Sequence, residues 1–243
     1  MSPTRIDSFK KLNDPELTFI SVPIDKAPPG CVLWLPGIPG SGNQIIDRSG
    51  KGNHGAITGA TRVRLPSGLP VLSYDGNDLI TLGNADSLKF ANTTTLTLEA
   101  WIYPTVNEAG DIIGRSAPYA YLFMVVASVA TVALRGQVWN TINTGYLPAD
   151  KDLLLNTWQH VAQVMDVPNL TTYVNGAQAA TIATLAGTFV QQGAPGTWIS
   201  SRGAAPAGDY FTGRIALPRM YTSALTVAQL LNHYQQERHL FGV

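Results

Sequence analysis

The stretch Asn156–Gly176, N-T-W-Q-H-V-A-Q-V-M-D-V-P-N-L-T-T-Y-V-N-G, decides the fold of this chain. Residues 158–163 alternate between Trp, His and Ala on one side and Gln, Val and Gln on the other. This period of two is typical of a β-strand. A Pro-Asn pair at residues 168 and 169 predicts a turn, and Leu170–Val174 then predicts a second strand.

Asn175-Gly176 follows directly and predicts a tight hairpin. Both central residues of a type I′ turn need positive φ, which Asn and Gly adopt most easily. Ala177–Thr184 can therefore return as a third strand. The whole unit is predicted to be a three-stranded antiparallel meander.

Five segments, in the same order along the chain, resemble the motifs of concanavalin A-like, laminin-G-like jelly-roll domains. The first in importance is the hairpin, W-x-H-V-A followed by L-x-x-Y-V-N-G. The other four are D-R-S-G-K-G-N-H-G at 47–55, S-Y-D-G-N-D-L-I at 73–80, L-T-L-E-A-W-I-Y-P at 96–104, and F-T-G-R-I, R-M-Y and S-A-L between 211 and 225. The resemblance implies an all-β, concanavalin A-like jelly-roll β-sandwich of two antiparallel sheets, with an N-terminal arm and one C-terminal helix.

Two units are expected along the chain. Residues 1–29 are polar and proline-punctuated and are predicted to form a partly extended arm, while residues 30–243 form the jelly-roll domain. The period changes at Thr226, where a helix is predicted over about 226–238. Thr226 and Gln229 form a capping box that marks its start. Its apolar face, expected to pack on a sheet edge, is Val227, Leu230, Leu231 and Tyr234.

The longest apolar stretch is Leu122–Leu134. It is too short to span a bilayer, which needs about 20 residues, and it is rich in valine. It is predicted to form buried strands with a bend at residues 127–129. Membrane insertion is not expected.

Charged residues make up 13% of the chain, against about 25% in average soluble domains, and 16 Lys and Arg balance 16 Asp and Glu. Neither nucleic acid nor an anionic membrane is indicated as a partner, and low charge favours association with other subunits. Cys31 is the only cysteine and is expected to be buried. Residues 1–11 show no apolar segment of a secretion signal.

No enzymatic activity is expected. Related glycosidases carry an E-x-D-x-x-E strand, and this chain has no such triplet. Glu99 stands alone on its predicted strand and is interpreted as an outward residue or a satisfied hydrogen-bond partner rather than a catalytic acid. The four histidines show no metal spacing, so His160 is interpreted as structural.

No cofactor is expected, with a structural calcium ion as the one alternative. Asp47 and the cluster at Asp75 and Asp78 are the best oxygen ligands, and related domains often hold calcium. The same residues are also standard turn formers, which is the preferred interpretation. The family's Asp-Glu-Val after Ile215 is replaced by Ala-Leu-Pro, which weakens the calcium alternative, and Pro218 is expected to interrupt its strand.

A glycan site needs aromatic rings beside Asn, Asp or Gln side chains, because a sugar stacks its apolar face on a ring and presents its hydroxyls to polar groups. Four tryptophans lie within apolar strand patterns and are assigned to the core: Trp34, Trp101, Trp158 and Trp198. The candidates for glycan binding are Tyr119, Tyr121, Trp139, Asn140, Asn143 and Tyr146.

The leading hypothesis is a non-catalytic structural or adhesion subunit of a larger assembly, such as a phage or viral decoration, spike or tail protein. The arm would bind other subunits, the chain would form a homo-oligomer, and a surface glycan is a further partner. The protein would be made in the host cytoplasm and end in the virion. The alternative is a free carbohydrate-binding module, located outside the cell or on its surface. A glycan-active enzyme is the third hypothesis.

Overall fold

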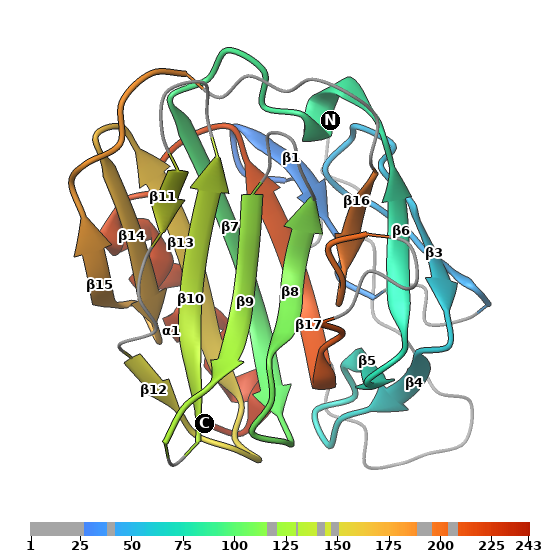
Figure 1. Ribbon diagram of the computed structural model, residues 1–243. Coiled ribbons are helices and arrows are strands. Elements are labelled where there is room, and N and C mark those ends of the chain that lie inside the picture. The colour runs from blue at the N-terminus through green and yellow to red at the C-terminus, as the bar shows by residue number, and fades with distance from the viewer. Residues whose placement is uncertain are drawn as a thin grey trace, which may run out of the picture.

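The structure is a computed structural model that describes residues 27–37, 42–115, 121–129, 131–139, 144–146, 151–188, 196–203 and 209–243. Two antiparallel sheets pack face to face, and one helix lies behind them (Figure 1). This confirms the predicted jelly-roll sandwich. Residues 1–26 of the predicted arm lie outside the described residues. Within the described part, no helix is both long and apolar enough to cross a membrane.

Sheet A has eight strands and holds the meander at one side. Its path runs through β15 (Ala177–Ile182), β14 (Asn169–Val174), β13 (Gln159–Asp166), β7 (Thr95–Pro104), β17 (Thr212–Tyr221), β5 (Pro70–Asp75) and β4 (Thr61–Arg64), and β1 (Cys31–Trp34) also pairs with β17.

Sheet B has nine strands and faces the viewer in Figure 1. Its path runs through β11 (Thr144–Tyr146), β10 (Val132–Trp139), β9 (Tyr121–Ala127), β8 (Gly110–Arg115), β16 (Thr197–Ile199), β6 (Leu79–Gly83), β3 (Gly55–Thr58) and β2 (Gln44–Ile45), and β12 (Lys151–Leu153) also pairs with β10. A short 3₁₀ helix, η1 (Asp86–Leu88), follows β6.

The predicted meander is present with the predicted turn. Strands β13, β14 and β15 pair as antiparallel neighbours, and Val161 lies opposite Val174. Asn175 and Gly176 have φ values of 51° and 77°, as a type I′ turn requires. The segment that decides the fold therefore forms one side of sheet A.

The long apolar stretch forms a second hairpin, also as predicted. It supplies nearly all of β9 and the start of β10, with a tight turn in which the Ser128 amide donates to the Thr131 carbonyl at 3.0 Å. Phe123 and Val125 point into the core between the sheets, whereas Met124 and Val126 belong to a separate small cluster. Both faces of this strand are covered, which explains its continuous hydrophobicity.

The Ala-Leu-Pro substitution interrupts the ladder of β17, as expected. The register between β17 and β7 shifts between Ala216 and Arg219, and Leu217 takes a φ of 49°. The Pro218 carbonyl accepts a hydrogen bond from the Leu35 amide instead. Strand β17 continues beyond this bulge to Tyr221.

Helix α1 (Val227–Phe241) begins at the predicted capping box and ends three residues later than predicted. The prediction that it packs on a sheet edge was wrong. It covers the outer face of sheet A at its middle, because the Phe241 ring stacks on Trp101 of β7 at 4.2 Å. The predicted apolar face is only partly right. Val227 and Leu231 are 46% and 38% exposed, and the buried positions are Leu230, Glu237, Leu240 and Phe241.

Sheet A is therefore buried on both faces. One core lies between the two sheets, and a second lies between sheet A and α1. All four tryptophans assigned to the core are at most 7% exposed: Trp34, Trp101, Trp158 and Trp198. Cys31 is also buried, and this burial raises the pKa of its thiol to about 12.

Candidate functional site

A buried polar cluster joins α1 to sheet A. Glu99, on β7, is fully buried and accepts hydrogen bonds from Arg219 Nη1 at 2.8 Å and from the Tyr221 hydroxyl at 3.1 Å. Its other oxygen lies 3.0 Å from His233 Nδ1 of α1 and 3.6 Å from His160 Nε2 of β13. With Glu237 of α1, six polar residues from four elements meet here.

Glu237 continues the cluster on the helix. One of its oxygens pairs with Arg219 Nη2, and the other accepts a hydrogen bond from Trp101 Nε1 at 2.8 Å. Arg219 thus bridges two buried carboxylates, and its guanidinium also lies 5.4 Å from the centre of the Trp34 ring. Burial alone would raise the pKa of Glu99, but the Arg219 charge and the contacts with the two histidines hold that pKa well below its usual value.

This cluster confirms that Glu99 is a satisfied hydrogen-bond partner. The sequence interpretation of His160 missed its acidic neighbour, which comes from another strand and could not be found by spacing along the chain. All of these groups lie beneath α1, so the cluster fixes the helix to the sheet. It does not line an open cleft.

The candidate calcium ligands are held by the turns that contain them. Asp47 is 5% exposed, and its carboxylate accepts hydrogen bonds from four protein donors. These donors are the Trp34, Ser49 and Asn53 amides and the Ser49 hydroxyl, at 2.7–2.9 Å. Such a carboxylate is already coordinated by N–H and O–H groups.

Asp75 and Asp78 lie together in the turn between β5 and β6, where Asp78 accepts from the Asp75 amide at 2.9 Å. Asp75 itself accepts from the Asn77 amide at 3.4 Å. Among the residues that the structure describes, no three His, Cys, Asp or Glu side chains form a group that could hold a metal ion. The geometry of both segments is that of hydrogen-bonded turns.

One glycan candidate was wrong. Tyr121 is fully buried and faces the core, because its position on β9 lies in register with Val138 and Arg115, which are also buried. Its hydroxyl donates to the Leu88 carbonyl at 3.0 Å. A ring in this position cannot stack on a sugar. Tyr119, Asn140 and Asn143 lie outside the described residues.

The β10–β11 hairpin brings the remaining two candidates to neighbouring register positions. Trp139 lies opposite Thr144, and Gln137 lies opposite Tyr146. Residues opposite each other share a face of the sheet, and alternate residues along a strand do too. Positions 139 and 146 are therefore on the same outer face of sheet B as Gln137 and Arg135. Gln137 and Arg135 are both half-buried.

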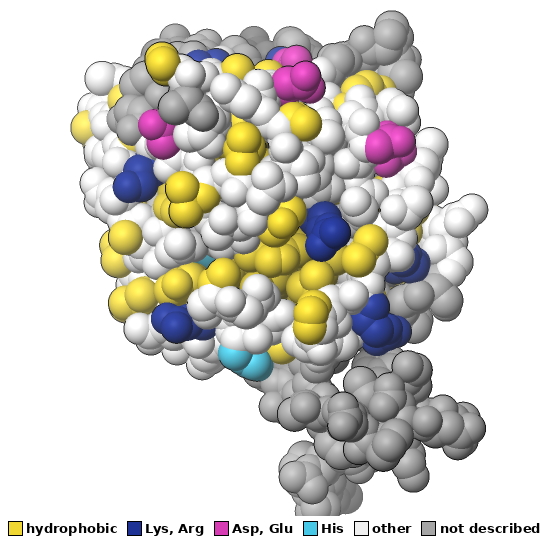
Figure 2. Space-filling model, turned by 90° about the horizontal axis from the view of Figure 1, so that it is seen from below, with side chains coloured by type: hydrophobic (Ala, Val, Ile, Leu, Met, Phe, Trp, Pro, Cys, Tyr) yellow, Lys and Arg dark blue, Asp and Glu magenta, His cyan; other side chains and the backbone are white. Residues whose placement is uncertain are grey.

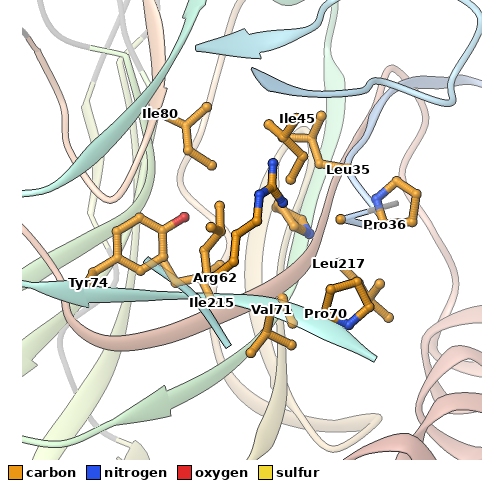
Figure 3. A pocket seen from close by; sticks show the side chains of 14 residues that line it. Leu35, Pro36, Ile45, Arg62, Pro70, Val71, Tyr74, Ile80, Ile215 and Leu217 are labelled. Atoms are coloured by element: carbon orange, nitrogen blue, oxygen red, sulfur yellow. The ribbon is translucent and has the colours of Figure 1, made fainter. Parts of the chain in front are cut away.

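A narrow slot opens between the edges of the two sheets (Figure 3). Its walls are mostly apolar, with Ile45 and Ile80 on one side and Pro70 and Val71 on the other. It holds about 290 Å³ of empty space, which includes open solvent at its mouth. Arg62 points into it and donates to the Gly42 and Gln44 carbonyls, so its guanidinium ties the two sheets together.

The end of the sandwich where β7 finishes shows a band of hydrophobic side chains with Lys and Arg side chains around it (Figure 2). Tyr103, the next-to-last residue of β7, is half-buried. The guanidinium carbon of Arg214 lies 5.3 Å from the centre of the Tyr103 ring, and the centre of the Trp158 ring lies 5.5 Å from it. This ring is therefore already occupied by protein groups.

Comparisons with solved structures agree with this fold. The chain is similar to the binding domain of Paraclostridial Mosquitocidal Protein 1, with 16% identity and a TM-score of 0.65 over 84% of this chain and 52% of that one. It is similar to domain 4 of AbnA, a GH43 extracellular arabinanase from Geobacillus stearothermophilus, with 17% identity and a TM-score of 0.62 over 83% and 97%. Botulinum neurotoxin type C matches with 12% identity and a TM-score of 0.63 over 85% and 51%.

The chain spans about half the length of the two toxin chains and nearly all of the arabinanase domain. No curated protein matches it. A family model described as the Concanavalin A-like lectin/glucanases superfamily matches residues 75–231, which is more than half of the chain and includes the meander, β7 and all of β17. With two antiparallel sheets in the expected order as well, this chain belongs to the concanavalin A-like lectin/glucanase superfamily.

Proposed function

We propose that this chain is a non-catalytic carbohydrate-binding domain, with its glycan site on the outer face of sheet B at the β10–β11 hairpin. The register of this hairpin carries the proposal. It gathers two aromatic positions, 139 and 146, with Gln137 and Arg135 on one face. Rings and hydrogen-bonding groups side by side are what sugar recognition requires.

The structural relatives support the same function. Domain 4 of AbnA was solved in complex with arabinotriose, and this chain covers 97% of that domain. Cell entry of botulinum neurotoxin type C depends on interaction with two ganglioside molecules. Both are sugar-containing ligands, although neither likeness exceeds 17% identity and therefore neither identifies the glycan.

The positions of the buried carboxylates support a role without catalysis. Glycoside hydrolysis uses two carboxyl groups, typically about 5–10 Å apart, on either side of an accessible bond. Glu99 and Glu237 are both bound to Arg219 beneath α1, and Asp111 is buried against Arg202. None of these three acids lines an open cleft.

A glycan array probed with the full chain tests the proposal. We expect binding to at least one glycan, and a loss of affinity of about tenfold or more in Trp139→Ala and in Arg135→Ala. Arg238→Ala is the matched control. Arg238 is exposed on α1, which lies on the face of sheet A that points away from sheet B and the proposed site. An array without binding, or equal affinities in all variants, would contradict the proposal. Turnover of a bound glycan would contradict its non-catalytic part.

A subunit role in a virion is the second proposal. Its support is the low charge of the chain, 13% charged residues with no net charge, which favours association. The arm that would bind neighbouring subunits lies outside the described residues. Light scattering of the purified chain over a range of concentrations tests the association. A strictly monomeric chain at every concentration would remove this support.

A further inference from the structure

One buried arginine has no acidic partner among the residues that the structure describes. Arg115, the last residue of β8, is fully buried. Its Nη1 donates to the Thr197 hydroxyl at 3.1 Å, and its Nη2 donates to the Asn84 side-chain oxygen at 2.5 Å. Its Nε is buried and has no hydrogen-bond partner.

The groups around this guanidinium supply no negative charge. Thr197 and the Tyr121 hydroxyl are hydrogen-bonded to each other at 3.1 Å, and Tyr121 donates to the Leu88 carbonyl. The hydroxyl protons therefore run from Thr197 to Tyr121 to a backbone oxygen. Every acceptor near Arg115 is neutral, and no ion pair to it exists within the described ranges.

The second buried arginine of the described residues is paired with acids. Arg219 contacts two carboxylates, those of Glu99 and Glu237. A buried charge without a counter-ion is costly, so proteins normally pair it. Consistent with this cost, burial lowers the pKa of Arg115 from its ordinary value.

One hydrogen-bond partner of the guanidinium lies at the surface. Asn84, the partner of Nη2, is exposed at the surface, in the segment between β6 and η1. Rotation of this one amide side chain would open Nη2 to solvent. The same rotation would leave two donors, Nη2 and the unpartnered Nε, for an incoming group.

We propose that Arg115 is an anion-binding site, which takes an oxyanion such as a carboxylate or a phosphate in place of the Asn84 amide. The planar guanidinium matches such groups because parallel N–H donors can bind two of their oxygens. Arg115 lies in register with Tyr121, which in turn pairs with Val138, next to Trp139. The oxyanion could therefore be a free ion or the carboxylate of an acidic sugar bound at the same end of sheet B.

Thermal unfolding of the full chain tests this site, with sodium phosphate and sodium glucuronate compared with sodium chloride at equal ionic strength. We expect at least one of the first two to raise the melting temperature in a saturable way, since it binds only the folded state. A response to both anions indicates a general oxyanion site, and a response to glucuronate alone indicates an acidic sugar. The apparent affinity should fall about tenfold or more in Arg115→Met. Arg214→Met, at the far end of the sandwich, is the control and should keep the response.

Asn84→Asp gives a second test that does not depend on the folding of the arginine variant. It places a built-in carboxylate beside Nη2. We expect it to raise the melting temperature in chloride and to abolish the response to added anions. An unchanged anion response in Asn84→Asp would overturn the proposal. Equal melting temperatures of the wild-type chain in all three salts would overturn it as well.

Discussion

Replacing Arg219 with methionine should destabilise this chain strongly, because one side chain neutralises two buried carboxylates. Glu99 is fully buried and Glu237 is 8% exposed, and both are bound to the same guanidinium. Methionine fills similar space against Trp34 but leaves both acids without a counter-charge. Removing one partner of a buried ion pair typically costs about 3–5 kcal/mol, so we expect a loss of at least about 3 kcal/mol in unfolding free energy.

Chemical denaturation at neutral pH, followed by tryptophan fluorescence, measures this loss. Arg214→Met is the matched control, since Arg214 is half-buried over the Tyr103 ring and should cost less than about 1 kcal/mol. Adding Glu99→Gln to Arg219→Met should recover part of the loss, because it removes one of the two unpaired charges. A loss below about 1 kcal/mol in Arg219→Met, or no recovery in the double variant, would refute this account of the cluster.

Three further outcomes follow from particular residues. Burial raises the pKa of Asp111 to about 7, although the charge of Arg202 opposes this rise. Because the folded state therefore holds this proton more tightly than the unfolded state, protonated Asp111 contributes stability that is fully present below about pH 4 and is lost as the pH rises through 7. Asp111→Asn should therefore flatten the fall in unfolding free energy between those pH values, and an unchanged slope would contradict the assignment. Thr226→Ala removes the capping box and should cost about 1 kcal/mol in denaturation, with retained stability as the contrary result. Gly176→Ala should cost more than about 1 kcal/mol, because φ is 77° and the new Cβ would lie 2.7 Å from Leu231 Cα; a neutral effect would show that the turn can shift.

The features predicted correctly from the sequence are set by local chemistry. The Asn175-Gly176 turn and the Thr226 capping box each depend on residues a few positions apart. The β9–β10 hairpin was also found, because a stretch of valines bounded by a weak turn favours strands covered on both faces. Such signals do not depend on which distant strands become neighbours.

The features that were missed depend on long-range pairing. His160 gains its acidic neighbour only because β13 pairs with β7, which places it opposite Trp101, beside Glu99. The position of α1 depends on Trp101, Phe241 and Glu237, and helical periodicity could not show that a glutamate belongs to the buried face.

The misassignment of Tyr121 had a usable signal. Tyr121, Phe123 and Val125 alternate along one strand, and this alternation already indicated that all three share the core face. The lone charge of Arg115 had no comparable signal, because a missing partner becomes visible only when the surrounding chain is in place.

The central position of β17 in sheet A sets the order in which this chain can fold. The meander closes through short turns, so its contacts form over short sequence separations and should appear early. Strand β17 must enter between β7 and β5 and also receive β1, and its Arg219 meets Glu99 across 120 residues of chain. Closing such large loops costs entropy before any contact compensates for it. The insertion of β17, followed by the docking of α1, is therefore expected to limit the folding rate, and until then the apolar outer face of the meander stays open to solvent.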